Sequence, residues 1–106
     1  MPKDALVSRG RYLCVDPSHP DVVEFRPQAG AWEEVAIEKA GTGFSAKFVA
    51  ANVYFCLTPN GDYQTRKAVG GWETLQIAEQ PADWKTSLAF RVEDGKVIDV
   101  LQVETR

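Results

Sequence analysis

The chain has 106 residues, 44% of them hydrophobic and 25% charged, which fits one folded domain and argues against a disordered segment. Its formal net charge is −3 and its basic residues form no cluster, so we expect no nucleic-acid partner, because binding a phosphate backbone requires a concentrated basic surface. No apolar stretch approaches the roughly 20 residues of a membrane-spanning helix, and the first residues lack the apolar run of a signal peptide. We therefore expect no membrane contact and, for the sequence as written, a cytoplasmic location.

Short β-strands are predicted along most of the chain. Several segments are rich in aromatic and β-branched residues, which suit a pleated, half-buried surface. Two others alternate between apolar and polar residues, as strands with one buried face do. In chain order, the predicted strands that are clearest are 32–38, 44–49, 53–57, 72–78, 89–92 and 97–100.

Turn signals separate these strands. Asn60-Gly61 follows segment 53–57, and Asp94-Gly95 precedes segment 97–100. Both pairs tolerate the positive φ angles of tight hairpins. Pro and Gly recur at a spacing of about 8–12 residues, which is typical of a sandwich or barrel of short strands. With no convincing helical stretch, the sequence predicts an all-β domain of about ten strands.

An internal repeat organises the chain. Tyr12-Leu13-Cys14 recurs as Tyr54-Phe55-Cys56, and Gly30-Ala31-Trp32-Glu33 recurs as Gly70-Gly71-Trp72-Glu73. Further matching pairs are Pro17 with Pro59, Arg26 with Arg66, Ile37 with Ile77, and Phe48 with Phe90. Residues 1–106 therefore form a single domain of repeat units at approximately 5–43, 44–85 and a partial 86–106.

The repeated pattern resembles the fascin-like branch of the β-trefoil family. The motifs that carry the resemblance are Gly10–Cys14 and Arg26–Ile37 in the first unit, and Asn52–Cys56 and Arg66–Ile77 in the second. The resemblance implies a β-trefoil-like, pseudo-symmetric barrel of short hairpins whose third repeat is incomplete. Members of this family and their trefoil relatives mostly bind: fascins bundle actin, and similar modules occur in lectin-like and viral proteins or beside glycoside hydrolases.

The incomplete third unit has a physical consequence. A trefoil normally has three units, and a barrel that lacks one hairpin would expose unpaired strand edges, which proteins usually cover. The chain could be part of a larger protein, or another chain could complete the barrel. A homo-oligomer would cover such an edge with a second copy of the chain.

Few residues suit catalysis or metal binding. Cys14 and Cys56 lie in apolar segments, so we interpret them as free, buried thiols. His19, the one histidine, follows Ser18 in a Pro-bracketed turn, and no Gly-x-Ser-x-Gly or phosphate-binding loop is present. We therefore expect no enzyme activity, no metal and no cofactor.

The repeated Trp-Glu pair has two interpretations. Trp32 and Trp72 could be platforms for sugars, but their equivalent positions favour a structural role at the base of each unit. Glu33 and Glu73 could act as an acid–base pair, but the repeat separates them around the pseudo-symmetry axis. The favoured interpretation pairs each Glu with the Arg seven residues before it, across a hairpin.

The candidate ligand-binding residues lie in turns where the repeats differ. A carboxylate, an amide and an aromatic ring together could bind the hydroxyls and the C–H face of a sugar. The candidates are Asn60, Asp62, Tyr63 and Gln64 at the second-unit turn, Asp16 and Asp21 at the first-unit turn, and Trp84. Each could instead be a solvated turn residue, and Trp84 could plug the open end of the barrel.

Two functions are compatible with these observations. The favoured one is a non-catalytic, lectin-like module that binds carbohydrate. The alternative is a protein–protein interaction or assembly domain of a cytoskeletal, viral or inhibitory protein, completed by a partner chain.

Overall fold

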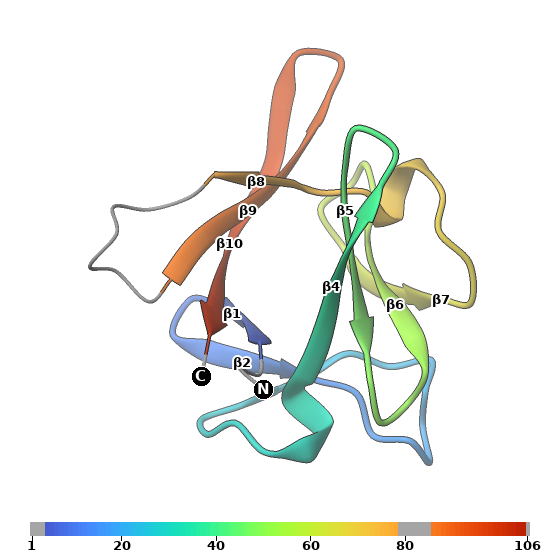
Figure 1. Cartoon of the computed structure of the whole chain (residues 1–106), viewed down its shortest axis with the longest axis vertical. Coiled ribbons are helices and arrows are strands. Elements are labelled where there is room, and N and C mark those ends of the chain that lie inside the picture. The colour runs from blue at the N-terminus through green and yellow to red at the C-terminus, as the bar shows by residue number, and fades with distance from the viewer. Residues whose placement is uncertain (1–3, 79–85, 106) are drawn as a thin grey trace.

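The computed structural model describes residues 4–78 and 86–105, and these residues form an all-β domain, as predicted (Figure 1). Two single-turn 3-10 helices interrupt the strands, and the described residues contain no α-helix. The strands are β1 (Asp4–Ser8), β2 (Arg11–Cys14), β3 (Glu24–Arg26), β4 (Glu34–Ala40), β5 (Gly43–Phe48), β6 (Val53–Leu57), β7 (Tyr63–Arg66), β8 (Gln76–Ala78), β9 (Thr86–Glu93) and β10 (Lys96–Thr105). The 3-10 helices are η1 (Ala31–Glu33) and η2 (Gly71–Glu73).

The strands form one antiparallel sheet in the order β7-β6-β5-β4-β1-β10-β9-β8, with β2 pairing with β1 and β3. The sheet is not closed by a continuous ladder. A single isolated bridge, between Phe44 and Leu75, joins β5 to the residue before β8. In this bridge the Phe44 N–H donates to the Leu75 carbonyl at 2.8 Å, and the Leu75 N–H donates to the Phe44 carbonyl at 2.7 Å.

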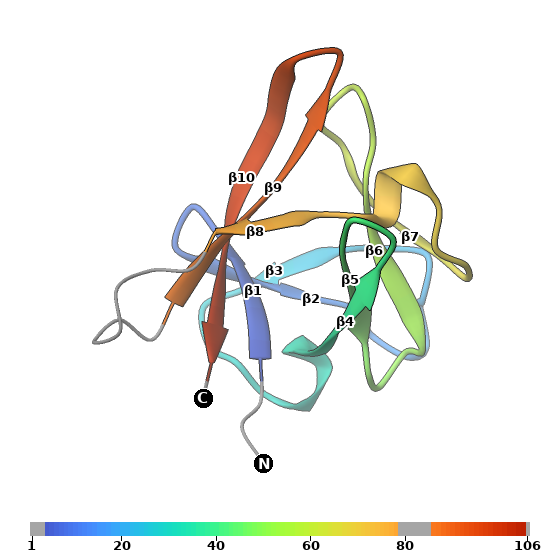
Figure 2. The same cartoon turned by 45° about the horizontal axis from the view of Figure 1, so that its top comes forward.

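Two segments of the chain share the same order of elements: strand, hairpin, 3-10 turn, strand. The first contains β1 to β4 with η1, and the second contains β5 to β8 with η2. The last strands, β9 and β10, are joined directly by Asp94 and Gly95, which both have the positive φ expected of this turn. Their hairpin extends beyond the rest of the sheet (Figures 1 and 2).

The core lies between the strands and is apolar. Buried residues alternate with less buried ones along parts of β4, β5 and β10, because side chains in a strand alternate between faces. Each large side chain that is fully buried contributes about 1.5–3 kcal/mol relative to an exposed one. The largest buried side chains are Phe48, Phe55, Leu6, Leu13, Leu57, Leu75 and Leu101.

Three local expectations need correction. The predicted strands 32–38 and 72–78 begin later, at Glu34 and Gln76, because η1 and η2 occupy their first residues. At the turn after β6, only Gly61 has a positive φ, of 85°, and Asn60 does not. The Gly61 N–H donates to the Thr58 carbonyl at 2.9 Å, so the loop is a β-turn followed by a left-handed glycine.

The predicted strand 53–57 is confirmed to the residue, and the predicted strand 44–49 is shifted by one residue at each end. No helix among the described residues is long and apolar enough to cross a membrane.

Candidate functional site

Tyr63, at the start of β7, packs between the two hairpins β2–β3 and β6–β7. Its ring meets Phe55 edge-on, with centroids 5.2 Å apart, and lies 5.9 Å from the ring of Phe25. The residue is half-buried and packs against the core. As placed, the ring takes part in the packing of the two hairpins.

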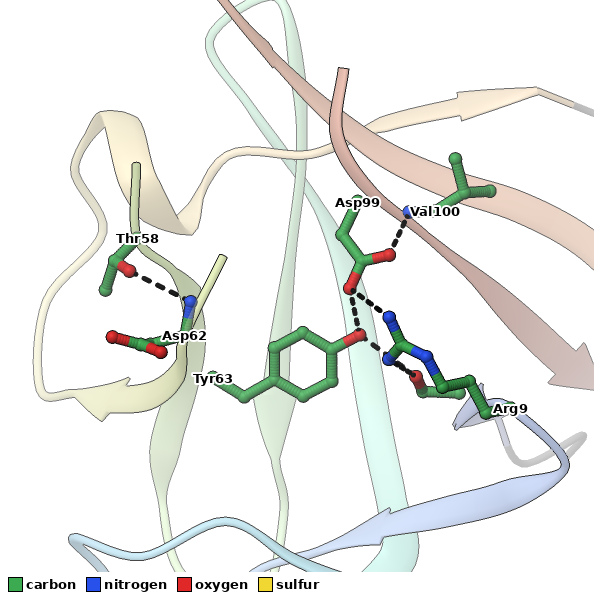
Figure 3. Close-up of polar contacts among 7 residues, drawn as sticks. Arg9, Thr58, Asp62, Tyr63, Asp99 and Val100 are labelled. Atoms are coloured by element: carbon green, nitrogen blue, oxygen red, sulfur yellow. Dashed lines mark hydrogen bonds and ion pairs between the residues drawn. The ribbon is translucent and has the colours of Figure 1, made fainter. Parts of the chain in front are cut away.

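The hydroxyl of Tyr63 lies in a polar network that links distant parts of the chain (Figure 3). It donates to Asp99 Oδ2 at 2.5 Å and shares a hydrogen bond of 3.0 Å with Ser8 Oγ. Arg9 Nη1 donates to the same Ser8 oxygen at 3.1 Å, and Arg9 Nη2 lies 3.8 Å from Asp99 Oδ2. Burial, and then the hydrogen bond to Asp99, raises the pKa of Tyr63. The network therefore connects β7, β10 and the β1–β2 turn.

A bulge in β10 accompanies the inward placement of Asp99. The pairing of β9 with β10 shifts register between Val97 and Asp99, so that Asp99 stands opposite Arg91. Its second oxygen, Oδ1, accepts the N–H of Val100 at 2.8 Å. A β-bulge commonly redirects a side chain in this way, and here that side chain is Asp99.

The other predicted residues of the second-unit turn do not join this network. Asn60 and Asp62 are exposed, and Gln64 is half-buried opposite Cys56 in the β6–β7 ladder. The backbone N–H of Asp62 donates to Thr58 Oγ1 at 3.1 Å. The Asp62 carboxylate points away from the Tyr63 ring (Figure 3). The structure therefore does not gather these side chains around one position.

The first-unit aspartates lie in separate places. Asp16 Oδ1 accepts the Ser18 N–H at 2.8 Å, and Asp16 Oδ2 lies 3.7 Å from His19 Nδ1. Asp21 is exposed and lines a cleft of about 240 Å³ formed with Pro20, Val53, Thr65, Arg66 and Lys67. This cleft joins the first-unit turn to β7. Trp84 lies outside the described residues.

The rings of Trp32 and Trp72 are partly exposed, at positions for which the sequence favoured a structural role. Trp32 and Trp72 are 38% and 41% exposed, at the middle positions of η1 and η2. The Arg26 guanidinium lies 5.8 Å from the centroid of the Trp32 ring. Arg26 also lines a cleft of about 360 Å³ together with Gln28 and residues of the η1 turn. Trp32 and Trp72 therefore hold equivalent positions, as the repeat predicted, but part of each ring reaches solvent while the following Glu is directed inward.

Glu33 and Glu73 are buried caps, and the expected cross-hairpin ion pair with Arg is not what the structure shows for them. Glu33 Oε1 accepts the Gly30 N–H at 2.5 Å, and Glu73 Oε1 accepts the Gly70 N–H at 2.7 Å. A carboxylate that accepts the amide three residues earlier closes the 3-10 turn.

The same carboxylates approach the two cysteines. Cys14 and Cys56 are free and buried, as predicted. Burial, and then a hydrogen bond to Glu33, raises the pKa of Cys14 to about 12. Burial and a hydrogen bond to Glu73 raise the pKa of Cys56 to about 12 in the same way. Both thiols therefore stay protonated at neutral pH and act as small core residues.

No model of a known protein family and no curated protein matches this chain. Among residues 4–78 and 86–105, no group of three His, Cys, Asp or Glu residues is placed to hold a metal ion. The exposure of the Trp32 and Trp72 rings is the site feature that the sequence analysis considered but did not favour. The Gly before each Trp-Glu pair was the available signal, since it indicates a turn rather than the start of a strand.

Proposed function

We propose that the chain is a non-catalytic carbohydrate-binding module with a β-trefoil-like architecture. The repeated element order and the Phe44–Leu75 bridge support the architecture. With this bridge, strands β1, β4, β5, β8, β9 and β10 follow one another in a ring, and the β2–β3 and β6–β7 hairpins stand outside it. The third unit would then lack a hairpin of this kind.

The single observation that carries the function is the pair of exposed Trp rings. An indole face stacks on the C–H face of a sugar ring, and nearby polar groups bind the hydroxyls. Arg26 and Gln28 line the cleft beside η1 and could supply such groups. Because Trp32 and Trp72 occupy repeat-related turns, they would form two separate sites. Two weak sites on one chain gain apparent affinity on a dense glycan surface.

A glycan microarray tests this proposal. We expect the labelled protein to bind a defined group of glycans, and Trp32→Ala or Trp72→Ala to lose much of the signal, because either change removes the second point of attachment. Val69→Ala is the matched control, since Val69 is a 40% exposed apolar residue outside the two turns. A blank array, or binding that survives loss of both Trp rings, would refute the proposal.

The β9–β10 hairpin favours a second candidate, an assembly domain that pairs with another copy of the chain. Val92 and Val97 stand opposite each other, and together with Val100 they are 45–55% exposed. The described pairing of β8 with β9 stops at Phe90, and that of β1 with β10 stops at Gln102, which leaves the hairpin edges unpaired.

The hairpin is also complementary to itself in charge. Glu93 precedes the turn, Asp94 lies in it and Lys96 follows it. A two-fold related copy packed on the valine face would place the basic side chain near the acidic ones. Light scattering should then show a dimer that Val97→Lys converts to a monomer. A monomer at every concentration would exclude this candidate.

A further inference from the structure

Arg91 is a buried cation whose hydrogen-bonding groups are only partly used. It lies on β9 and is 5% exposed. Its Nε donates to the Leu57 carbonyl at 2.7 Å, which ties β9 to the end of β6. Its Nη1 lies 3.4 Å from Glu93 Oε1, whereas its Nη2 is buried and has no hydrogen-bond partner among residues 4–78 and 86–105. Asp99, opposite Arg91 in the ladder, is engaged by Tyr63 instead.

A buried guanidinium in this state is unusual. Leaving a buried donor unpaired removes its hydration without replacement, which is unfavourable by about 1–3 kcal/mol. The Glu93 contact is long for a charged hydrogen bond, and the Glu93 side chain is 32% exposed. The buried guanidinium is therefore held on this side by one loosely placed carboxylate, and it is the Glu93 side chain that reaches solvent.

A cleft of about 350 Å³ borders this residue. It lies between the β4–β5 turn, η2 and β9, which are neighbours at one end of the molecule (Figure 1). Its lining residues are Ala40, Gly41, Thr42, Gly71, Thr74, Gln76, Arg91 and Val92. Arg91 is the one charged residue of this lining, and the adjacent Glu93 offsets its charge; once Glu93 is displaced, the field in the cleft favours an anion.

We propose that this cleft binds a carboxylate, which pairs with Nη1 and Nη2 of Arg91 and takes the place of Glu93. The planar guanidinium fork matches the two oxygens of a carboxylate, and Glu93 occupies only one side of it in the structure. Displacing Glu93 moves a partly exposed side chain into solvent and leaves the Nε bond to Leu57 intact. This inference goes beyond the proposed function, because neither Trp32 nor Trp72 takes part.

The test uses the Arg91 Nε–Hε resonance of the ¹⁵N-labelled chain, which should be visible because this N–H is buried and bonded to Leu57. The probes are acetate, galacturonate, N-acetylglycine, and the uncharged galactose and acetamide, all at constant ionic strength. We expect a saturable shift with the three carboxylates and none with the uncharged compounds. Tighter binding of galacturonate would assign an acidic saccharide as the source, and tighter binding of N-acetylglycine would assign a peptide terminus.

Three variants test the direction of the predicted change in affinity. Glu93→Gln removes the competing carboxylate, so acetate should bind about 10-fold more tightly, the factor expected for one charged hydrogen bond. Glu38→Gln, which removes an exposed charge on β4, should leave the affinity unchanged. Arg91→Lys should abolish the response of neighbouring Gly41 and Gly71 amides.

Three results would overturn the proposal. They are the absence of a shift with any carboxylate, an equal shift with acetamide, and no difference between Glu93→Gln and Glu38→Gln. The comparison of Glu93→Gln with Glu38→Gln does not depend on whether an Arg91 variant folds. Failure here leaves the glycan experiment unaffected, because that experiment reads Trp32 and Trp72.

Discussion

Replacing Tyr63 by Phe removes one oxygen from the network that links β7, β10 and the β1–β2 turn. The change deletes the 2.5 Å hydrogen bond to Asp99 and the 3.0 Å contact with Ser8. A hydrogen bond to a charged group contributes about 1.5–3 kcal/mol. Because Asp99 and Ser8 both keep their contacts with Arg9, and the ring keeps its contact with Phe55, we expect a loss of about 1–2 kcal/mol.

Urea unfolding followed by circular dichroism measures this loss as a lower midpoint at an unchanged slope. Tyr54→Phe is the control, since no hydrogen bond of the Tyr54 hydroxyl is recorded among the described residues, and it should change stability by less than about 0.5 kcal/mol. If Tyr63→Phe were as stable as the wild type, the network would not hold the strands together, and Tyr63 would again be available as a ligand contact.

Four further predictions concern the bridge, the thiols (two predictions) and the caps. A Cβ on Gly43 would lie 2.4 Å from the Leu75 carbonyl, so Gly43→Ala should lower stability by about 1–3 kcal/mol in the same assay, and an unchanged midpoint would contradict the close approach. Cys14 and Cys56 have folded pKa values of about 12, above the ordinary 9.0, so iodoacetamide at pH 8 should modify them only after unfolding. Between pH 9.0 and about 12 the thiols lose their protons in the unfolded chain but keep them in the folded one, so their contribution to stability is complete below pH 9.0 and falls as the pH rises. The Tm should therefore fall over this range. A Tm that does not change with pH there would contradict the prediction. Glu73→Ala leaves the Gly70 amide unpaired and should lower the free energy of unfolding by about 1–3 kcal/mol, whereas a change below about 0.5 kcal/mol would contradict a capping role.

The sequence predicted those parts of the fold that depend on local pattern. Strand 53–57 follows from its aromatic and β-branched residues, and the Asp94-Gly95 hairpin follows from residues that accept positive φ. Burial of Cys14 and Cys56 follows from their apolar neighbours. These features need no knowledge of which strand lies beside which.

The candidate site depends on distant contacts, and there the sequence was insufficient. The hydrogen-bond partner of Tyr63, Asp99, lies 36 residues away in the sequence. A bulge turns Asp99 inward, and no local sequence motif predicts this bulge. Val23 stands at the matching place in the first unit, so the repeat alone gave no reason to expect a buried hydroxyl network. The exposure of Trp32 and Trp72 depends on a buried glutamate that closes each turn, and a period-two pattern conceals this arrangement.

The most direct test of the carbohydrate proposal is a titration of the ¹⁵N-indole spectrum with the glycan that binds best on the array. Trp32→Ala and Trp72→Ala assign the two relevant signals. The account predicts that both indole resonances shift along the same saturation curve, because the two rings occupy equivalent turns. If both stay fixed while the amides of 60–64 move, the site lies at the second-unit turn and the proposal for the Trp rings is wrong.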